Sequence, residues 1–346
     1  SISIRFGADS PLVSSITQGF EYSDCWVDDA RLVVLNAMQA RDLGADIRVR
    51  TKCRSLQRLK GLWRAELEDL ITGEISILHA KAAVNAAGPW VQSIFENQIG
   101  EVAPRRIRLV QGSHIIVPKL YEGKHCFILQ NEDKRIVFAI PYEGDFTLIG
   151  TTDMEVRGDP AQAKIDSLEK RYLIALINGY FKKKIREDDI VHHYSGVRAL
   201  LDDEKTDPSK VTRDYVLERS GGGDEPGLVS VFGGKVTTYR VLAEAVMEKL
   251  KPFFPDLPPP WTQHNPLPGG DFESPETLLV SLLQDCPWLP EVVARRYVRS
   301  YGTLAWDIVK DAQNWKAMGE DFGFVLTKRE MDYLCTKEMA LNAEDI

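Results

Sequence analysis

The stretch that decides the fold is G-L-V-S-V-F-G-G-K-V-T-T-Y-R, residues 227–240. Its apolar run predicts a buried strand and the pattern after it predicts a helix over 236–250, so Gly233 and Gly234 form a strand-to-helix turn. Two glycines let backbone N–H groups approach a ligand closely, and the start of a helix favours negative charge. With Lys235 beside it, this turn predicts a site for a polar or anionic group.

A nucleotide P-loop matches this turn poorly. Lys235 is followed by Val236 where that motif has Ser or Thr, and Val229 stands in place of its first glycine. A second small-residue turn, N-A-A-G-P-W at 85–90, ends a strand predicted from residue 81 and leads into a helical pattern. Both turns leave room for a ligand, and both also suit a simple contact between a helix and a strand.

The chain up to residue 250 reads as short strands with a few helices between them. Helices are predicted over 30–43, after an Asp-Asp start and before Gly44, and over 166–181. Strands are predicted at 46–51, 62–68, 74–79, 107–117, 126–129, 135–140, 146–150, 190–199, 214–219 and 227–232. The first three predict a meander, and the next four predict a largely antiparallel sheet.

Seven prolines between residues 252 and 268 are incompatible with regular helix or a central strand. We therefore place a linker there. Ser274-Pro275 resembles a helix start, and the remainder reads as several short helices.

Composition excludes several classes of protein. The 346 residues include 43 basic and 51 acidic side chains, a net charge of −8, so no global positive field attracts nucleic acid. The longest apolar run is six residues, 172–177, where about 18 are needed to span a bilayer. Five scattered cysteines without a C-x-x-C pair disfavour a disulfide framework or a zinc site and favour a reducing, cytoplasm-facing setting.

Two polar side chains in predicted strands are candidate ligand contacts. Arg198 ends Y-S-G-V-R, where its planar fork could bind phosphate or carboxylate, although an ordinary salt-bridged arginine explains it too. His114 follows Gln-Gly-Ser, whose small residues leave room around the ring, although a histidine in a strand is more often structural.

Taken together, these segments resemble the flavin-dependent (aerobic, respiratory) glycerol-3-phosphate dehydrogenase family. The matching strings are G-F-E-Y-S-D-C-W-V-D-D-A-R-L at 19–32, V-N-A-A-G-P-W at 84–90, Q-G-S-H at 111–114, L-Q-N-E-D-K-R-I-V-F at 129–138, I-G-T-T-D at 149–153, Y-S-G-V-R at 194–198, T-R-D-Y at 212–215, F-G-G-K-V-T-T-Y-R at 232–240 and G-E-D-F-G at 319–323. The resemblance covers nearly the whole chain.

The resemblance implies an α+β fold with α/β character. It comprises part of an FAD-binding domain, a mixed and mainly antiparallel substrate-domain sheet, and a helical C-terminal domain. The expected divisions are 1–105 (remnant of the FAD-binding domain and start of the substrate domain), 106–251 (substrate domain and second half of the FAD site), 252–270 (Pro-rich linker) and 271–346 (helical domain). The family's N-terminal glycine-rich fingerprint is absent, so we expect a truncated product of the enzyme.

The resemblance also implies roles for single residues. FAD contacts are expected from Lys52, Cys53, Asn85, Ala87, Gly88, Trp90, Gly233, Gly234, Lys235, Val236 and Thr237. Arg198 and Arg213 are expected to bind the phosphate of glycerol 3-phosphate, with Thr151 positioning its reacting end. His114 would contact the substrate hydroxyls, and His114 or Lys235 would take the C2 hydroxyl proton if burial lowers its pKa. No metal is expected.

The implied reaction is oxidation of glycerol 3-phosphate to dihydroxyacetone phosphate by hydride transfer to FAD, with electrons passed on to quinone. This implies peripheral association with the cytoplasmic face of the inner membrane, for which Lys182-Lys183-Lys184 is a candidate patch, and is compatible with a homodimer. Two different interpretations stay open: a related flavin amine or amino-acid oxidase, and a flavin-free, non-catalytic fragment.

Overall fold

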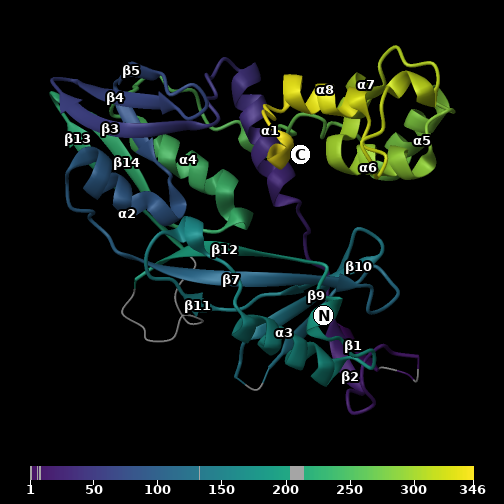
Figure 1. Cartoon of the computed structure of the whole chain (residues 1–346). Coiled ribbons are helices and arrows are strands. Elements are labelled where there is room, and N and C mark those ends of the chain that lie inside the picture. The colour runs from purple at the N-terminus through teal and green to yellow at the C-terminus, as the bar shows by residue number, and fades with distance from the viewer. Residues whose placement is uncertain (1, 6, 8, 132, 203–213) are drawn as a thin grey trace. The chain divides into compact units, whose positions relative to one another are not determined.

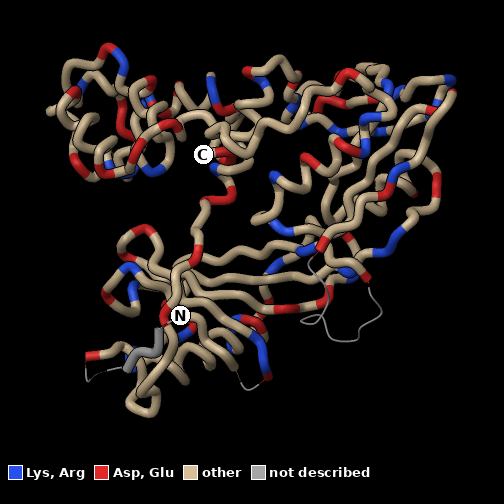
Figure 2. The backbone as a smooth tube through the Cα atoms, turned by 180° about the vertical axis from the view of Figure 1, so that it is seen from behind, with Lys and Arg blue, Asp and Glu red and all other residues tan. Residues whose placement is uncertain are grey.

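The computed structural model describes residues 2–5, 7, 9–131, 133–202 and 214–346, and its contacts divide the chain into two compact units (Figure 1). Unit 1 comprises Ser1–Asp24, Lys52–Glu68 and Gly73–Leu257. Unit 2 comprises Cys25–Thr51, Asp69–Thr72 and Pro258–Ile346. Acidic and basic residues are interspersed along the backbone of both units (Figure 2).

A large, antiparallel sheet dominates unit 1. Its strands are β7 (Ile107–Pro118), β8 (Phe127–Gln130), β9 (Ile136–Tyr142), β10 (Phe146–Gly150), β11 (Met154–Glu155) and β12 (His192–Leu201). The order is β11-β7-β10-β9-β8, and β12 pairs along the length of β7, so the two run side by side in Figure 1. The predicted antiparallel sheet is thereby confirmed.

Helix α3 (Ser167–Tyr180) covers one face of this sheet. A capping box in which the Asp166 side chain accepts from Glu169 N–H starts the helix. Its apolar stripe, which includes Leu173 and Ile177, packs on Ile115 and Ile149 of the sheet, and all four side chains are fully buried. This core fixes which side chains of the sheet face α3.

Two smaller sheets complete the core of unit 1. A three-strand meander is present, but its first strand lies later in the chain than predicted: its strands are β3 (Thr51–Leu59), β4 (Leu62–Asp69) and β5 (Ile75–Ala80). A second sheet has the order β13-β14-β6, in which β13 (Tyr215–Gly222) is antiparallel and β6 (Ala82–Asn85) parallel to β14 (Glu225–Gly233). The remaining elements are β1 (Ile2–Arg5), β2 (Gln18–Glu21), α2 (Val91–Ser93), a π-helical turn at Ile94–Ile99 and α4 (Tyr239–Leu250).

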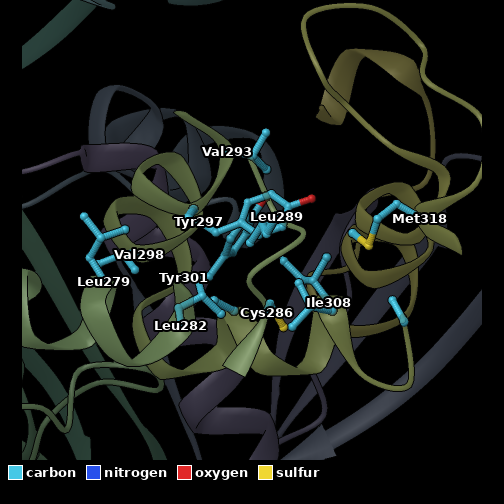
Figure 3. Close-up of a cluster of buried hydrophobic side chains, with 14 of the residues drawn as sticks. Leu279, Leu282, Cys286, Leu289, Val293, Tyr297, Val298, Tyr301, Ile308 and Met318 are labelled. Carbon is cyan, nitrogen blue, oxygen red and sulfur yellow. The ribbon is translucent and has the colours of Figure 1, made fainter. Parts of the chain in front are cut away.

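Unit 2 is helical. It contains α1 (Asp29–Asp42), α5 (Pro275–Asp285), α6 (Glu291–Tyr301), α7 (Ala305–Val309) and α8 (Lys328–Lys337). Its core gathers aliphatic and aromatic side chains of α5, α6 and α7 around Leu282, Tyr297 and Ile308 (Figure 3). Both helix starts predicted here are confirmed, because Asp28 caps α1 and Ser274 caps α5.

One predicted strand is wrong. Residues 46–51 alternate in polarity, yet residues 46–50 are not extended in a sheet, and β3 begins only at Thr51. Arg50 has a φ of 51°, which breaks an extended run, and Arg48 pairs with Asp46 at 2.7 Å. The first strand of the meander is therefore residues 51–59.

No helix in the described part of the chain is long and apolar enough to cross a membrane.

Candidate functional site

The face of the large sheet opposite α3 carries the predicted substrate residues. His114 of β7 lies directly across from Gly150 of β10 and Tyr194 of β12, and directly paired residues share a face. Their neighbours Ser113 and Ile115 point the other way, into the side that α3 covers. His114 and Arg198, which lie on separate strands, are thus brought to one open face.

Glycine makes the room in which His114 sits. A Cβ built on Gly150 would lie 2.1 Å from His114 Cδ2, so the imidazole occupies the space that a side chain there would need. On its other side, the ring stacks on Tyr194 with centroids 4.9 Å apart and planes 13° apart. The ring plane of His114 is therefore fixed by its two cross-strand neighbours.

Arg198 is held by two groups at the end of β10. Its Nη1 donates to Asp153 Oδ1 at 2.5 Å and its Nη2 donates to Thr151 Oγ1 at 3.1 Å. Gly112 makes room for this arrangement, because a Cβ there would lie 2.4 Å from both Arg198 Nη2 and Thr151 Oγ1. These contacts use two of the five guanidinium N–H bonds, which leaves donors for an oxyanion.

The two glycine turns predicted from sequence lie at equivalent places in the small sheet. Strands β6 and β14 are parallel, with Ser230 opposite Asn85, and each runs into a glycine turn followed by helical structure. Ligands of open α/β sheets bind beyond the carboxyl ends of parallel strands. This is the edge of the sheet where a cofactor would be expected.

The turn after β14 requires glycine. Gly233 and Gly234 have φ values of 78° and 105°, and a Cβ on Gly233 would lie 2.6 Å from Asp214 O. Lys235, Val236 and Thr237 follow as exposed residues at the start of the helical segment. The backbone can therefore approach a bound group closely, and the exposed helix start favours an anionic one.

The turn after β6 is shaped by Asn85. This side chain is buried, donates to Val91 O at 2.9 Å and accepts from Ala87 N–H at 3.3 Å. Gly88 has a φ of 52°, and the Trp90 indole is 42% exposed. Asn85 therefore orders the turn from within, while the partly exposed Trp90 donates its indole N–H to Asp159 Oδ1 at 3.3 Å.

Both turns lie against β12. The Gly88–Trp90 turn and β14 each contact β12, and a Cβ on Gly233 would come within 3.3 Å of Leu201 Cγ. The end of the strand that carries Arg198 therefore meets the two turns predicted to hold the cofactor. The exposed apolar Trp90 and Val236 and the close-approach glycines fit FAD, a large and partly flat anionic cofactor.

Two of the remaining predicted residues lie in β3. Lys52 is an exposed residue of β3. Cys53 packs into a cluster with Leu56 and Phe232, and burial raises the pKa of its thiol. Arg213 lies outside the described residues.

Three residues of this site are not predicted from sequence. Asp153 and Tyr194 stand in the strings I-G-T-T-D and Y-S-G-V-R, but only the pairing of β7 with β10 and β12 shows that they face Arg198 and His114. Gly150 carries a signal, a glycine ending an apolar strand, that is typical of a close approach.

Comparisons with known proteins identify the family. A family model described as FAD dependent oxidoreductase matches residues 5–240. The chain is 52% identical to the glycerol-3-phosphate dehydrogenase of Pseudomonas aeruginosa, covering 99% of this chain and 67% of that protein. It is 45% identical to the aerobic glycerol-3-phosphate dehydrogenase of Escherichia coli (100% and 69%) and 46% identical to the D-erythritol 1-phosphate dehydrogenase of Brucella abortus (97% and 67%).

A solved structure agrees. The glycerol-3-phosphate dehydrogenase of Bacillus halodurans complexed with FAD superposes with a TM-score of 0.83 at 26% identity, covering 97% of this chain and 66% of that one. The chain thus spans about two thirds of the length of these relatives. It belongs to the FAD-dependent oxidoreductases and, within them, to the flavin-dependent glycerol-3-phosphate dehydrogenase family.

Proposed function

We propose that the protein oxidises sn-glycerol 3-phosphate to dihydroxyacetone phosphate. The observation that carries this proposal is the placement of Arg198 and His114 on one open sheet face, next to the glycine turns of the small sheet. Relatives named for the same substrate are up to 52% identical to this chain. A guanidinium that can bind phosphate and a histidine that can accept a hydroxyl proton, on the same sheet face, suit a polyol phosphate.

Arg198 binds the phosphate. Asp153 and Thr151 hold two of its N–H bonds, so the guanidinium is already oriented before a ligand arrives. A fixed planar fork suits the tetrahedral oxygens of a phosphate, and preorganisation lowers the entropic cost of binding. Arg213, the second predicted basic residue, stays a prediction.

His114 is the better placed of the two predicted proton acceptors. It lies on the same sheet face as Arg198, and stacking on Tyr194 holds its ring, so a substrate anchored at Arg198 presents its hydroxyls toward this face. Thr151 donates its hydroxyl proton to Thr152 O at 3.1 Å and accepts from Arg198, so it acts by orienting the arginine. FAD, when bound, supplies the hydride acceptor.

Lys235 and the backbone of Gly233 and Gly234 would hold FAD from the helix start, and Trp90 would cover another part of it. The exposed position of Lys235 leaves its charge available to an anionic group. Asn85, Ala87, Gly88, Val236 and Thr237 would contribute the two turns around the cofactor, and Lys52 and Cys53 would lie at its adenine end.

We also propose that the enzyme passes its electrons to quinone at the cytoplasmic face of the inner membrane. We propose further that it forms a homodimer. Lys182, Lys183 and Lys184 are exposed and can meet anionic headgroups. Two of these side chains also donate to backbone carbonyls, Lys183 to Lys119 O at 2.6 Å and Lys184 to Phe181 O at 2.8 Å. Lys184 thereby caps α3 as well, so part of this basic run has a structural role.

One relative favours a second candidate substrate. D-erythritol 1-phosphate dehydrogenase of Brucella abortus is 46% identical over 97% of this chain, so a longer polyol phosphate is the competing possibility. The test is steady-state oxidation by the FAD-loaded enzyme of glycerol 3-phosphate, D-erythritol 1-phosphate and unphosphorylated glycerol, with a soluble quinone analogue as acceptor. The highest kcat/KM is expected for glycerol 3-phosphate. A higher kcat/KM for D-erythritol 1-phosphate would make that compound the assigned substrate. An equal kcat/KM for unphosphorylated glycerol would show that the enzyme does not recognise the phosphate group.

The same preparation distinguishes the dehydrogenase from an amine or amino-acid oxidase and from a flavin-free chain. Oxidation of amino acids with oxygen consumption would favour an oxidase. Absence of flavin absorbance after incubation with FAD would favour a non-catalytic chain.

A further inference from the structure

A buried carboxylate lies beneath the sheet that carries Arg198. Glu169, the third residue of α3, is 4% exposed. Within the described part of the chain, its carboxylate contacts are hydrogen bonds from uncharged donors. Burying a carboxylate without a cation is costly unless hydrogen bonds replace its lost hydration. The energetically simpler residue at such a core position is apolar.

Four uncharged donors surround this carboxylate. Oε2 accepts from Gln111 Nε2 at 2.9 Å and from the Asp166 backbone N–H at 3.1 Å. Oε1 accepts from Ser113 Oγ at 2.8 Å and from Thr152 Oγ1 at 2.5 Å. Three of the four donors belong to the sheet side and only one to the start of α3, so the carboxylate ties the sheet to the helix.

Thr152 connects this carboxylate to the other face of the sheet. It is 1% exposed and stands between Thr151 and Asp153, the two residues that hold Arg198. Its Oγ1 also accepts from the Ser113 backbone N–H at 3.0 Å, which fastens the segment to β7. The three residues join β10 to β11 alongside β7, with the middle one anchored on the α3 side of the sheet and the outer two contacting the arginine on the opposite side.

We propose that Glu169 is a positioning residue for the phosphate site: by anchoring Thr152 it fixes Thr151 and Asp153, and through them the orientation of the Arg198 guanidinium. This inference rests on the proposed role of Arg198 in phosphate binding. It assigns Glu169 and Asp153 a function that goes beyond packing and local hydrogen bonding.

A glutamine cannot replace the carboxylate at this position without loss. Its amide has one acceptor oxygen, and that oxygen must face the Asp166 backbone N–H, which can only donate. The Gln111 amide beside it could present its own oxygen only by flipping, which would break its bond to Lys164 O. The introduced NH₂ group then faces Thr152 Oγ1, whose own proton loses its acceptor. Glu169→Gln should therefore loosen Thr152 while keeping the volume of the core.

The test measures binding of inorganic phosphate to the FAD-loaded enzyme, by calorimetry and as competitive inhibition. Glu169→Gln and Thr152→Val are each expected to weaken phosphate binding about tenfold, the size of one lost hydrogen bond to a charged group. The double variant should also be about tenfold weaker and not a hundredfold, because both changes break the same link. Thr152→Ser keeps the hydroxyl and should bind phosphate as the unaltered enzyme does.

A matched control separates positioning from general stability. Asn178→Ala removes two hydrogen bonds between the C-terminal end of α3 and Ile185, away from Glu169, so it should lower the melting temperature without changing phosphate affinity. If Glu169→Gln and Thr152→Val leave phosphate affinity within twofold while Arg198→Ala abolishes it, the positioning role is overturned and the phosphate site stands. If the unaltered enzyme does not bind phosphate competitively with substrate, the proposed function fails and this inference fails with it.

Discussion

At the scale of single residues, two glycines make room for the side chains of the site because neither carries a Cβ. Gly150 and Gly112 are both in the large sheet, where glycine is unfavourable, and each leaves space that a functional side chain fills. The space at Gly150 holds the His114 ring, and the space at Gly112 holds the contact between Arg198 and Thr151. Substitution at each position therefore tests a different part of the proposed reaction.

Gly150→Ala should lower kcat about tenfold or more with a smaller change in KM, because the new Cβ displaces the proposed proton acceptor. Gly112→Ala should instead raise KM for glycerol 3-phosphate, because the new Cβ displaces Arg198, the proposed phosphate-binding residue. Steady-state kinetics of both variants check this split. Gly196→Ala is the matched control, since a Cβ there meets no atom within 4 Å and should change KM less than Gly112→Ala does. Identical effects at positions 112 and 150 would contradict the separation of roles.

Cysteine reactivity gives a pH-dependent test at the same scale. Burial raises the pKa of the Cys53 thiol, so less of it is thiolate at any pH near neutrality than in an exposed cysteine. Alkylation of Cys53 by iodoacetamide should therefore lag behind that of Cys25 and Cys126, which are exposed, and should accelerate only at higher pH. Mass spectrometry of timed samples at about pH 7.5 and about pH 9.5, either side of an ordinary thiol pKa, measures this. Equal rates at the lower pH would show that Cys53 is not buried as described.

At the scale of elements, the cofactor turns depend on how the meander is joined to the small sheet. Trp63 of β4 is completely buried, and its indole N–H donates to Gly227 O of β14 at 2.7 Å. The guanidinium carbon of Arg58 lies 4.4 Å from the centre of the same ring. One tryptophan therefore fastens the meander to the strand that leads into Gly233.

Trp63→Phe should lower the free energy of unfolding by about 2–4 kcal/mol, because it leaves Gly227 O without its donor and opens a cavity. Urea denaturation monitored by circular dichroism measures the change. Trp261→Phe is the control for loss of an indole, since that side chain is 43% exposed. A loss below about 0.5 kcal/mol at position 63 would contradict the proposed attachment.

At the scale of the whole molecule, unit 2 is assembled from distant parts of the chain. Arg31 of α1 forms a bidentate ion pair with Glu338, whose side chain is 3% exposed, and donates through Nε to Ser300 O at 2.8 Å. Burial by itself would lower the pKa of Arg31, but the hydrogen bonds and charge of Glu338 outweigh it and raise that pKa. The pair therefore joins α1 to the C-terminal helices.

Arg31→Met should destabilise unit 2 by about 3 kcal/mol, because it leaves the Glu338 carboxylate buried without a cation. Thermal unfolding of the variant measures this, and Arg31→Met combined with Glu338→Gln should recover part of the loss. Arg48→Met, which breaks an exposed pair with Asp46, should cost less than about 1 kcal/mol. Equal losses of stability in Arg31→Met and Arg48→Met would show that the buried ion pair stabilises unit 2 no more than the exposed one.

Local pattern predicts most of the elements, since capping residues and strand alternation are encoded over a few neighbours. The strand predicted at 46–51 is wrong because a positive φ at Arg50 leaves no trace in an alternating pattern. Residues 25–51 group with the C-terminal helices through long-range contacts such as the buried ion pair between Arg31 and Glu338, 307 positions apart, which no local pattern records.

The same limit applies to the site. Arg198 and His114 can be predicted because their residue types suit the chemistry. Asp153 and Glu169 cannot, because their roles depend on strand register and on the packing of α3 beneath the sheet.

We propose above all that Arg198 binds the phosphate of the substrate, and one experiment tests this claim. It compares KM for glycerol 3-phosphate and flavin content in the FAD-loaded enzyme before and after Arg198→Ala. We predict a rise in KM of about 100-fold with flavin content unchanged, because two charge-assisted hydrogen bonds to phosphate are lost and no cofactor contact is. An unchanged KM would contradict the claim.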